Sequence, residues 1–215
     1  MTTTLYDALD RVVSVTDPVS GLRSWGYDVL SRVTGQTDAN GDNTQFQYDA
    51  NDNRISLTDA SSNVTQFQYD ALNRLILETD PLWKTSSTTY DDAGNLESHT
   101  DRLGRTIVYG YDEDNRRTSE EWLDALSATV QTQTYTYDEV GNLLTATDPD
   151  GDYTMTYDAL NRVSTTVQPF SFEQSFTYDA AGNRTLVTDN QGGSTASTFD
   201  VPNRILIAFV AELTL

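Results

Sequence analysis

The sequence contains no cysteine, one histidine and one lysine among its 215 residues. The absence of cysteine excludes disulfides, thiolate metal sites and cysteine nucleophiles. The single histidine, His99, excludes multi-histidine metal centres and leaves histidine acid–base chemistry to one side chain. An enzyme built on this chain would depend on carboxylates and hydroxyls. We therefore predict no catalysis and no cofactor.

Basic residues and long hydrophobic runs are also scarce. The chain has 33 acidic against 13 basic residues, for a net charge of -20. Nucleic-acid affinity comes mainly from Lys and Arg, so a nucleic-acid partner is not expected. No apolar run approaches the roughly 18 residues of a membrane helix, and the start MTTTLYDALD lacks the features of a signal peptide. We expect no membrane insertion.

The prominent positive feature is a repeat. Six Tyr-Asp pairs follow one another at intervals of 21 residues, three more continue the series, and Phe199-Asp200 keeps the phase. The pairs are Tyr6-Asp7, Tyr27-Asp28, Tyr48-Asp49, Tyr69-Asp70, Tyr90-Asp91, Tyr111-Asp112, Tyr137-Asp138, Tyr157-Asp158 and Tyr178-Asp179. Such a period indicates a repeat architecture. Residues 1–215 are predicted to form one array of ten repeats.

Each repeat contains two turn signals. The first follows the Tyr-Asp pair: the fourth residue after the aromatic tolerates positive φ, which indicates a type I turn closed by a bulge. These residues are Asp10, Ser31, Asp52, Asn73, Gly94, Asn115, Gly141, Asn161, Gly182 and Asn203. The next residue is Arg or Asn, and we expect the arginines to pair with aspartates or stack on tyrosines.

The second turn signal is a Thr-Asp pair 10 to 11 residues after the tyrosine, because an Asp side chain accepts a hydrogen bond from a backbone N–H about two residues on. Repeats six, eight and ten lack it. The pairs begin at Thr16, Thr37, Thr58, Thr79, Thr100, Thr147 and Thr188. We refer to the two kinds of turn as Tyr-Asp turns and Thr-Asp turns.

Between the turns the sequence alternates with period two. In TQFQY, which ends at Tyr48 and again at Tyr69, aromatics and glutamines take opposite faces of a strand. The predicted fold is all-β: a continuous antiparallel ribbon of about ten 21-residue hairpins, curved or spiralling into a shell or wide barrel segment. Residues 119–130 are an irregular insertion, either a helix capped by Ser119 or a lengthened hairpin. Residues 205–215 form an apolar tail.

Few residues stand apart from the repeat as candidate sites. Trp25 and Trp83, with Trp122, are candidates for stacking on sugar rings. Asp148, Asp150 and Asp152 alternate as calcium ligands do, although turn capping also explains them. His99 takes a strand position and does not indicate a triad. The predicted role of the Tyr-Asp pairs is structural.

The forms YDALNR, YDAAGNR and TDPDG resemble the YD-repeat, or RHS-repeat, family over essentially the whole chain. The resemblance implies a ribbon of hairpins that forms the wall of a hollow shell in bacterial polymorphic and insecticidal toxins, and a related barrel in animal adhesion receptors. It also implies a secreted or cell-surface location. The core segment that precedes self-cleavage in the bacterial toxins is not found, so no protease or toxin residue is carried over.

We therefore expect a non-catalytic wall segment, with a carbohydrate-binding or cell-adhesion module as the alternative. The expected partner is the remainder of a larger YD-repeat protein, or a second copy joined through exposed strand edges. Under the alternative function, the partner is a glycan.

Overall fold

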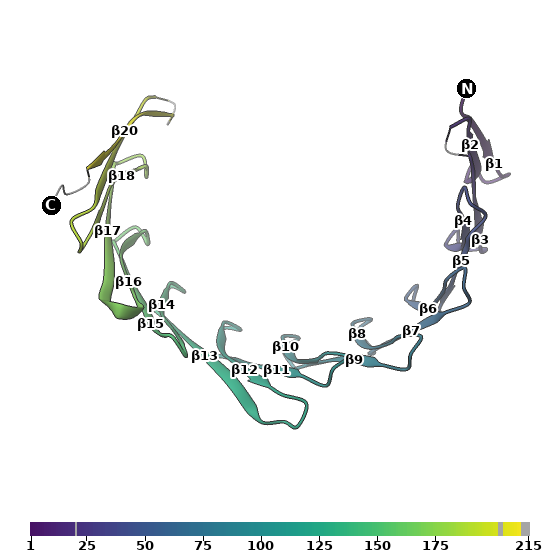
Figure 1. Cartoon of the computed structure of the whole chain (residues 1–215), viewed down its shortest axis with the longest axis horizontal. Helices are drawn as coiled ribbons and strands as arrows, with labels where there is room; N and C mark the ends of the chain where they lie inside the picture. The colour runs from purple at the N-terminus through teal and green to yellow at the C-terminus, as the bar shows by residue number, and fades with distance from the viewer. Residues whose placement is uncertain (20, 202–203, 212–215) are drawn as a thin grey trace. The chain divides into compact units, whose positions relative to one another are not determined.

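The computed structural model describes residues 1–19, 21–201 and 204–211, with side chains through residue 205. It consists of β-strands joined by short turns (Figure 1). The strands of the first half are β1 (Thr3–Tyr6), β2 (Val12–Asp17), β3 (Gly21–Tyr27), β4 (Val33–Thr37), β5 (Asn43–Tyr48), β6 (Arg54–Thr58), β7 (Val64–Tyr69), β8 (Leu75–Thr79), β9 (Thr85–Tyr90) and β10 (Leu96–Thr100).

The second half continues the series. Its strands are β11 (Thr106–Tyr111), β12 (Arg117–Leu123), β13 (Thr129–Tyr137), β14 (Leu143–Asp148), β15 (Gly151–Tyr157), β16 (Val163–Gln168), β17 (Phe172–Tyr178), β18 (Arg184–Asp189), β19 (Ser194–Phe199) and β20 (Ile205–Ala211). The short 3-10 segment η1 (Pro169–Ser171) joins β16 to β17. No described helix is long and apolar enough to cross a membrane.

The chain divides into two compact units of the same construction. Unit 1 comprises residues 1–91 and 98–106, and unit 2 comprises residues 92–97 and 107–215. In unit 1 each strand from β1 to β8 pairs antiparallel with the strand that follows it in the sequence. The same holds in unit 2 from β12 to β19. The predicted all-β fold of antiparallel hairpins is confirmed.

The Tyr-Asp turns have the predicted geometry. Nine of the ten predicted left-handed residues have φ between 58° and 94°, including Asp10 at 58° and Gly141 at 94°. The tenth, Asn203, lies outside the described residues. The strand register shifts by one residue just before the tyrosine, for example between Gln47 and Tyr48. This shift is the bulge expected after a left-handed turn residue.

Residues 119–130 form a lengthened hairpin, and the helix alternative is wrong. Strand β12 pairs with β13, with Ser119 opposite Thr134 and Trp122 opposite Gln131. A helix here would leave the backbone groups of the adjoining strand without ladder partners, which is costly. The connecting turn is led by Asp124. It has the geometry of a Thr-Asp turn, although no threonine precedes Asp124.

The fold has no hydrophobic core among the residues whose side chains are described. The only buried residue there is Glu120, at 9% exposure. The accessible surface of 14453 Å² is about 1.5 times the roughly 9,900 Å² expected for a compact protein of 23.9 kDa. The hairpins therefore depend on contacts within turns and between neighbouring hairpins. The side chains of the predicted apolar tail beyond Ile205 lie outside the described residues.

Candidate functional site

The Tyr-Asp turns carry the repeated polar chemistry of this protein, and the turn after Tyr157 illustrates it. One carboxylate oxygen of Asp158, Oδ1, accepts hydrogen bonds from the backbone N–H groups of Leu160 and Arg162, at 2.9 and 3.1 Å. The other, Oδ2, accepts one from Arg162 Nε at 2.7 Å. The backbone N–H of Asn161 donates to the Asp158 carbonyl at 3.0 Å. A single aspartate thus satisfies the turn backbone and holds the arginine in place.

These hydrogen bonds stabilise the charged form of the aspartates. The side-chain hydrogen bond from Arg162, followed by the backbone hydrogen bond from the same residue, lowers the pKa of Asp158. In the turn after Tyr178, the side-chain amide of Asn183 has the same effect on the pKa of Asp179. The aspartates with a lowered pKa are Asp7, Asp28, Asp49, Asp59, Asp70, Asp101, Asp112, Asp138, Asp158, Asp179 and Asp200.

The lowered pKa values predict acid sensitivity. A carboxylate whose folded-state pKa is depressed contributes stability above its unfolded pKa of about 3.9, and this contribution is lost as the pH falls through the folded-state value. We expect the urea midpoint to be nearly flat between about pH 5 and pH 7, and to fall steeply below about pH 4. Denaturation curves across this range would test the prediction. A midpoint that drops already between pH 7 and pH 5 would contradict it.

In eight of the nine Tyr-Asp pairs, the tyrosine contacts the hairpin that precedes it. Its hydroxyl donates to the carbonyl of the residue that directly follows the Arg or Asn of the previous Tyr-Asp turn. Tyr27 donates to Val12 at 2.8 Å, and Tyr178 donates to Val163 at 2.7 Å. Six other tyrosines make the equivalent bond, at 2.8 to 3.5 Å: Tyr48, Tyr69, Tyr90, Tyr111, Tyr137 and Tyr157.

The arginine of the preceding turn completes this contact. The Arg32 guanidinium lies 4.8 Å from the centre of the Tyr48 ring, and its Nη1 donates to the Asp49 carbonyl at 2.8 Å. The same stacking joins Arg11 to Tyr27, Arg74 to Tyr90, Arg116 to Tyr137 and Arg162 to Tyr178. We call the combination of tyrosine hydroxyl, preceding carbonyl and stacked arginine the tyrosine–arginine contact. The sequence predicts that these arginines pair with aspartates or stack on tyrosines, and they do both.

Repeats with asparagine in place of arginine link neighbouring turns differently. Asn53 Nδ2 donates to Asp49 Oδ2 in its own turn and to Asn73 Oδ1 in the following turn, at 2.9 and 2.7 Å. Asn142 makes the equivalent pair of bonds to Asp138 and Asn161. The two turn sequences, ending in Arg or in Asn, are therefore alternative ways of joining one hairpin to the next.

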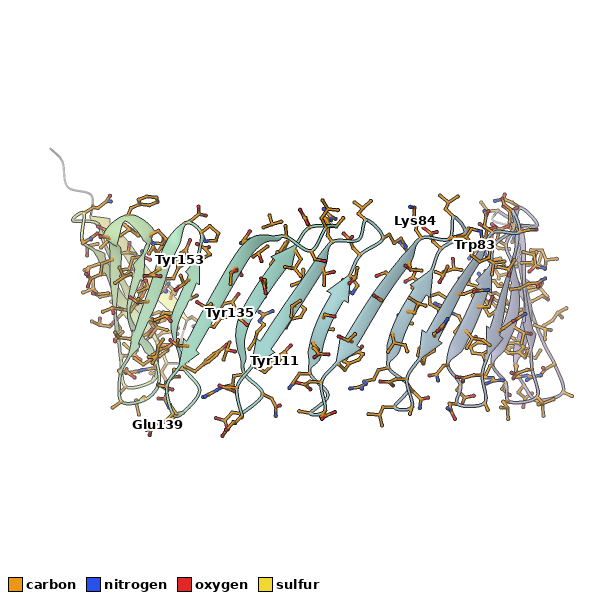
Figure 2. The ribbon with its side chains drawn as sticks, turned by 90° about the horizontal axis from the view of Figure 1, so that it is seen from below. Trp83, Lys84, Tyr111, Tyr135, Glu139 and Tyr153 are labelled. Carbon is orange, nitrogen blue, oxygen red and sulfur yellow. The ribbon has the colours of Figure 1, made fainter. Side chains whose placement is uncertain are left out.

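The three tryptophans differ in exposure. Trp25 is half-buried in β3, and Trp122 donates from Nε1 to Glu120 Oε2 at 3.2 Å. Trp83 is 79% exposed and lies with Lys84 in a Thr-Asp turn (Figure 2). It borders a cavity of about 290 Å³, whose other lining residues include Asn63, Gln66 and Asp80. Among the candidates for sugar stacking, Trp83 alone combines a mostly exposed ring with a cavity.

The backbone at Trp83 is strained, since its φ is 64°. The equivalent position of the next Thr-Asp turn is Gly104, with φ of 80°. A left-handed conformation costs an L-residue about 1–2 kcal/mol relative to glycine. We predict that Trp83→Gly stabilises the folded protein by about 1 kcal/mol, measured by urea denaturation. A loss of stability would show that the tryptophan ring contributes packing that outweighs its backbone strain.

The candidate calcium ligands serve the turn between β14 and β15. Asp148 Oδ1 accepts hydrogen bonds from the backbone of Asp150 and Gly151, and Asp152 Oδ1 accepts one from Thr147. Within the described part of the chain, no group of three or more His, Cys, Asp and Glu residues is arranged to hold a metal ion. Turn capping accounts for the position of Asp148, and Asp152 on β15 bonds to a threonine on the facing strand.

His99 lies half-buried on β10 between two hydroxyls. Its Nδ1 is 3.2 Å from Thr88 Oγ1, and its Nε2 is 3.5 Å from Ser86 Oγ. The Ser86 hydroxyl donates to the Thr100 carbonyl at 3.1 Å. Because the proton of Ser86 is directed to a backbone carbonyl and the histidine has no carboxylate partner in these bonds, the arrangement lacks the geometry of an activated nucleophile.

One cluster in unit 2 is not evident from the sequence. The buried carboxylate Glu120 accepts from Trp122 and pairs with Arg117 Nη1 at 2.5 Å. The Arg117 guanidinium lies 5.9 Å from the Tyr109 ring and 5.4 Å from the Tyr135 ring. Burial, followed by the charge of Glu120, raises the pKa of both tyrosines. Tyr109 and Tyr135 occupy the repeat position of Phe46 and Phe67, which flank Arg54 in the same way, but among the described side chains Glu120 is the only buried carboxylate.

Comparison with known proteins agrees with this architecture. The family model described as RHS Repeat matches residues 6–44, 30–63, 48–82, 90–121, 137–173 and 157–195. Among solved structures, the crystal structure of TcdB2-TccC3 matches with a TM-score of 0.68 and 17% identity over 97% of this chain. A Photorhabdus luminescens Tc holotoxin pore matches with a TM-score of 0.69 and 17% identity, again over 97%.

The matched region is a small part of those proteins. It covers 14% of the TcdB2-TccC3 chain and 13% of the holotoxin chain, so this sequence spans about one seventh of their length. At 17% identity, the likeness shows a shared fold. The search of curated proteins found no match.

Proposed function

Because this chain belongs to the RHS repeat family, we propose that it is a non-catalytic segment that builds the wall of a larger, secreted or surface-exposed protein of that family. The observation that carries the proposal is that the repeated tyrosines and arginines of the Tyr-Asp turns join one hairpin to the next. Eight tyrosine hydroxyls donate to the preceding hairpin, and five arginines stack on the tyrosine of the next one. Because these contacts join each hairpin to its neighbour, they extend a sheet along the chain.

The solved structures support the proposal through their fold. Each contains an equivalent region as part of a much longer chain. A sheet without a buried core has apolar side chains on its surface, including Leu22 and Ile55 at 53% and 36% exposure. When a sheet of this kind encloses a volume, its apolar surface can face cargo or a covering segment.

The experiment is electron microscopy of the full-length polypeptide that contains these residues. We expect particles with an enclosed volume, in which this segment is part of the wall. Particles in which the repeats form a separate, solvent-surrounded module would contradict the proposal. So would hydrolase turnover by the purified segment that disappears when a single aspartate is substituted.

The alternative function, carbohydrate binding, is favoured by one observation only, the exposed ring of Trp83 beside the amides of Asn63 and Gln66. The tyrosines of the Tyr-Asp pairs do not favour it, because eight of their hydroxyls and five of their ring faces contact neighbouring hairpins. A glycan array would test it, with Trp83→Ala compared against Trp25→Ala. Reproducible binding lost only in Trp83→Ala would support a sugar site; no binding by the unmodified chain would exclude it for the glycans on the array.

A further inference from the structure

We propose that the outer side of β13, at residues 129–133, binds an extended, basic polypeptide segment by strand addition. The added strand would continue the line of β14 beyond the point where β14 ends at Asp148. This interaction goes beyond the wall function, because it concerns the lengthened hairpin of one repeat and not the contacts that the hairpins share.

The lengthened hairpin leaves part of β13 paired on one side only. At nine residues, β13 is longer than the strands beside it (Figure 1). It pairs with β12 from Thr129 onward, but its pairing with β14 begins only at Thr134. We call residues 129–133 the free edge of β13. In shorter hairpins the corresponding stretch has two residues, 43–44 in β5 and 64–65 in β7.

The free edge of β13 lacks most of the features that prevent strand addition. Sheet edges are usually protected by lysine, proline, bulges or a covering segment. The free edge reads Thr-Val-Gln-Thr-Gln, without a basic residue or a proline. Within the described part of the chain, only β12 pairs with it. Its one bulge, at Val130, lies near the tip of the hairpin and leaves residues 131–133 as regular strand.

The surroundings of the free edge are acidic. Between Arg117 and Arg162 the sequence has no basic residue, and both arginines lie next to Tyr-Asp turns, at the other end of their hairpins. Asp150 is exposed in the turn that follows β14, and within the described residues its carboxylate has no hydrogen-bond or ion-pair partner. Glu121 accepts a hydrogen bond from Thr129, the first residue of the free edge. Lys or Arg in the added strand therefore complements the local charge.

Exposed apolar side chains of the hairpin favour an alternating sequence in the partner. Successive side chains of a strand point to opposite faces of the sheet. Val130 is 69% exposed, and Trp122, opposite Gln131, is 42% exposed. A partner with basic residues at every second position can carry apolar residues at the others, which are then available to contact these side chains.

The test is a titration of the 215-residue chain into a fluorescently labelled short peptide of alternating Lys and Val, followed by fluorescence anisotropy. We expect saturable binding with a dissociation constant between about 10 µM and about 1 mM, because a few ladder hydrogen bonds and exposed ion pairs contribute. The absence of saturable binding up to about 1 mM would overturn the proposal.

Two control peptides separate strand addition from simple adsorption of a basic peptide to a chain with a net charge of -20. The Lys-Val peptide methylated at every backbone nitrogen keeps its charge but donates no ladder hydrogen bonds, and it should bind at least about tenfold more weakly. A peptide of alternating Glu and Val keeps the ladder hydrogen bonds but is repelled, and it should also bind at least about tenfold more weakly. Equal binding of either control peptide would overturn the proposal.

Hydrogen exchange and one matched pair of variants locate the site. Peptide binding should slow amide exchange within residues 129–133 and leave exchange at residues 64–65 unchanged. Asp150→Asn should weaken binding about threefold, the effect of one exposed ion pair. Glu139→Gln removes an exposed charge at the opposite edge of the ribbon and should have no effect (Figure 2). Slowed exchange elsewhere but not in β13, or equal effects of the two variants, would overturn the proposal while leaving the electron-microscopy test of the wall function unaffected.

Discussion

Replacing Tyr48 with alanine is expected to lower the free energy of unfolding of unit 1 by about 3 kcal/mol. The substitution removes the 2.9 Å hydrogen bond to the Val33 carbonyl and the stacking of Arg32 on the ring. Each contributes on the order of 1 kcal/mol, and the apolar ring area lost contributes a further 1 to 2 kcal/mol. In a repeat array, this loss falls on the junction between two neighbouring hairpins.

Hydrogen exchange should locate the effect. We expect amides of β3 to β6 to lose protection in Tyr48→Ala, while strands further along unit 1 lose less, because each repeat contacts its neighbours only. Tyr6→Ala is the matched control, since it removes the same side chain from the same repeat position, where the tyrosine is 59% exposed. It should cost less than about 1 kcal/mol in the free energy of unfolding. Equal losses at the two positions would show that the tyrosine–arginine contact contributes little.

Replacing Glu120 with alanine is the second large effect that we expect, about 2 kcal/mol in unit 2. Glu120 balances the charge of Arg117 and accepts the indole hydrogen of Trp122. Its removal leaves a guanidinium between two aromatic rings without a counter-ion. Because the Arg117 side chain is 45% exposed, water compensates in part, and the cost stays below that of breaking a fully buried pair.

A second measurement distinguishes this mechanism from a general packing defect. The charge of Glu120 helps to raise the pKa of Tyr109 and Tyr135. In Glu120→Ala the pKa of these tyrosines should therefore shift down, which a spectrophotometric titration of tyrosine ionisation can detect. Glu121→Ala is the control: Glu121 accepts a hydrogen bond from the exposed Thr129 hydroxyl, and its loss should cost less than about 0.5 kcal/mol. An unchanged titration in Glu120→Ala would contradict the proposed role of its charge.

The sequence by itself determined the local structure. A hairpin is specified by interactions between residues a few positions apart. These residues are the alternating side chains of the strands, the aspartate at each turn, and a residue such as Asn161 or Gly141 at the left-handed position. The sequence also predicted which residues the arginines contact, although not which hairpin supplies the tyrosine. The Thr-Asp pattern does not predict the turn at Asp124, because no threonine precedes it, yet Asp124-Ala125-Leu126 repeats the start of the turn after Tyr69.

Only the tertiary structure decided the interactions between hairpins. The acceptor of each tyrosine hydroxyl lies about 15 residues earlier, on a strand whose register with the tyrosine's own strand is set by the one intervening turn. It also decided between helix and hairpin at residues 119–130, where backbone pairing with neighbouring strands outweighed a helical pattern of apolar residues. The burial of Glu120 likewise arises from side chains of three strands, β11, β12 and β13, which no local pattern brings together.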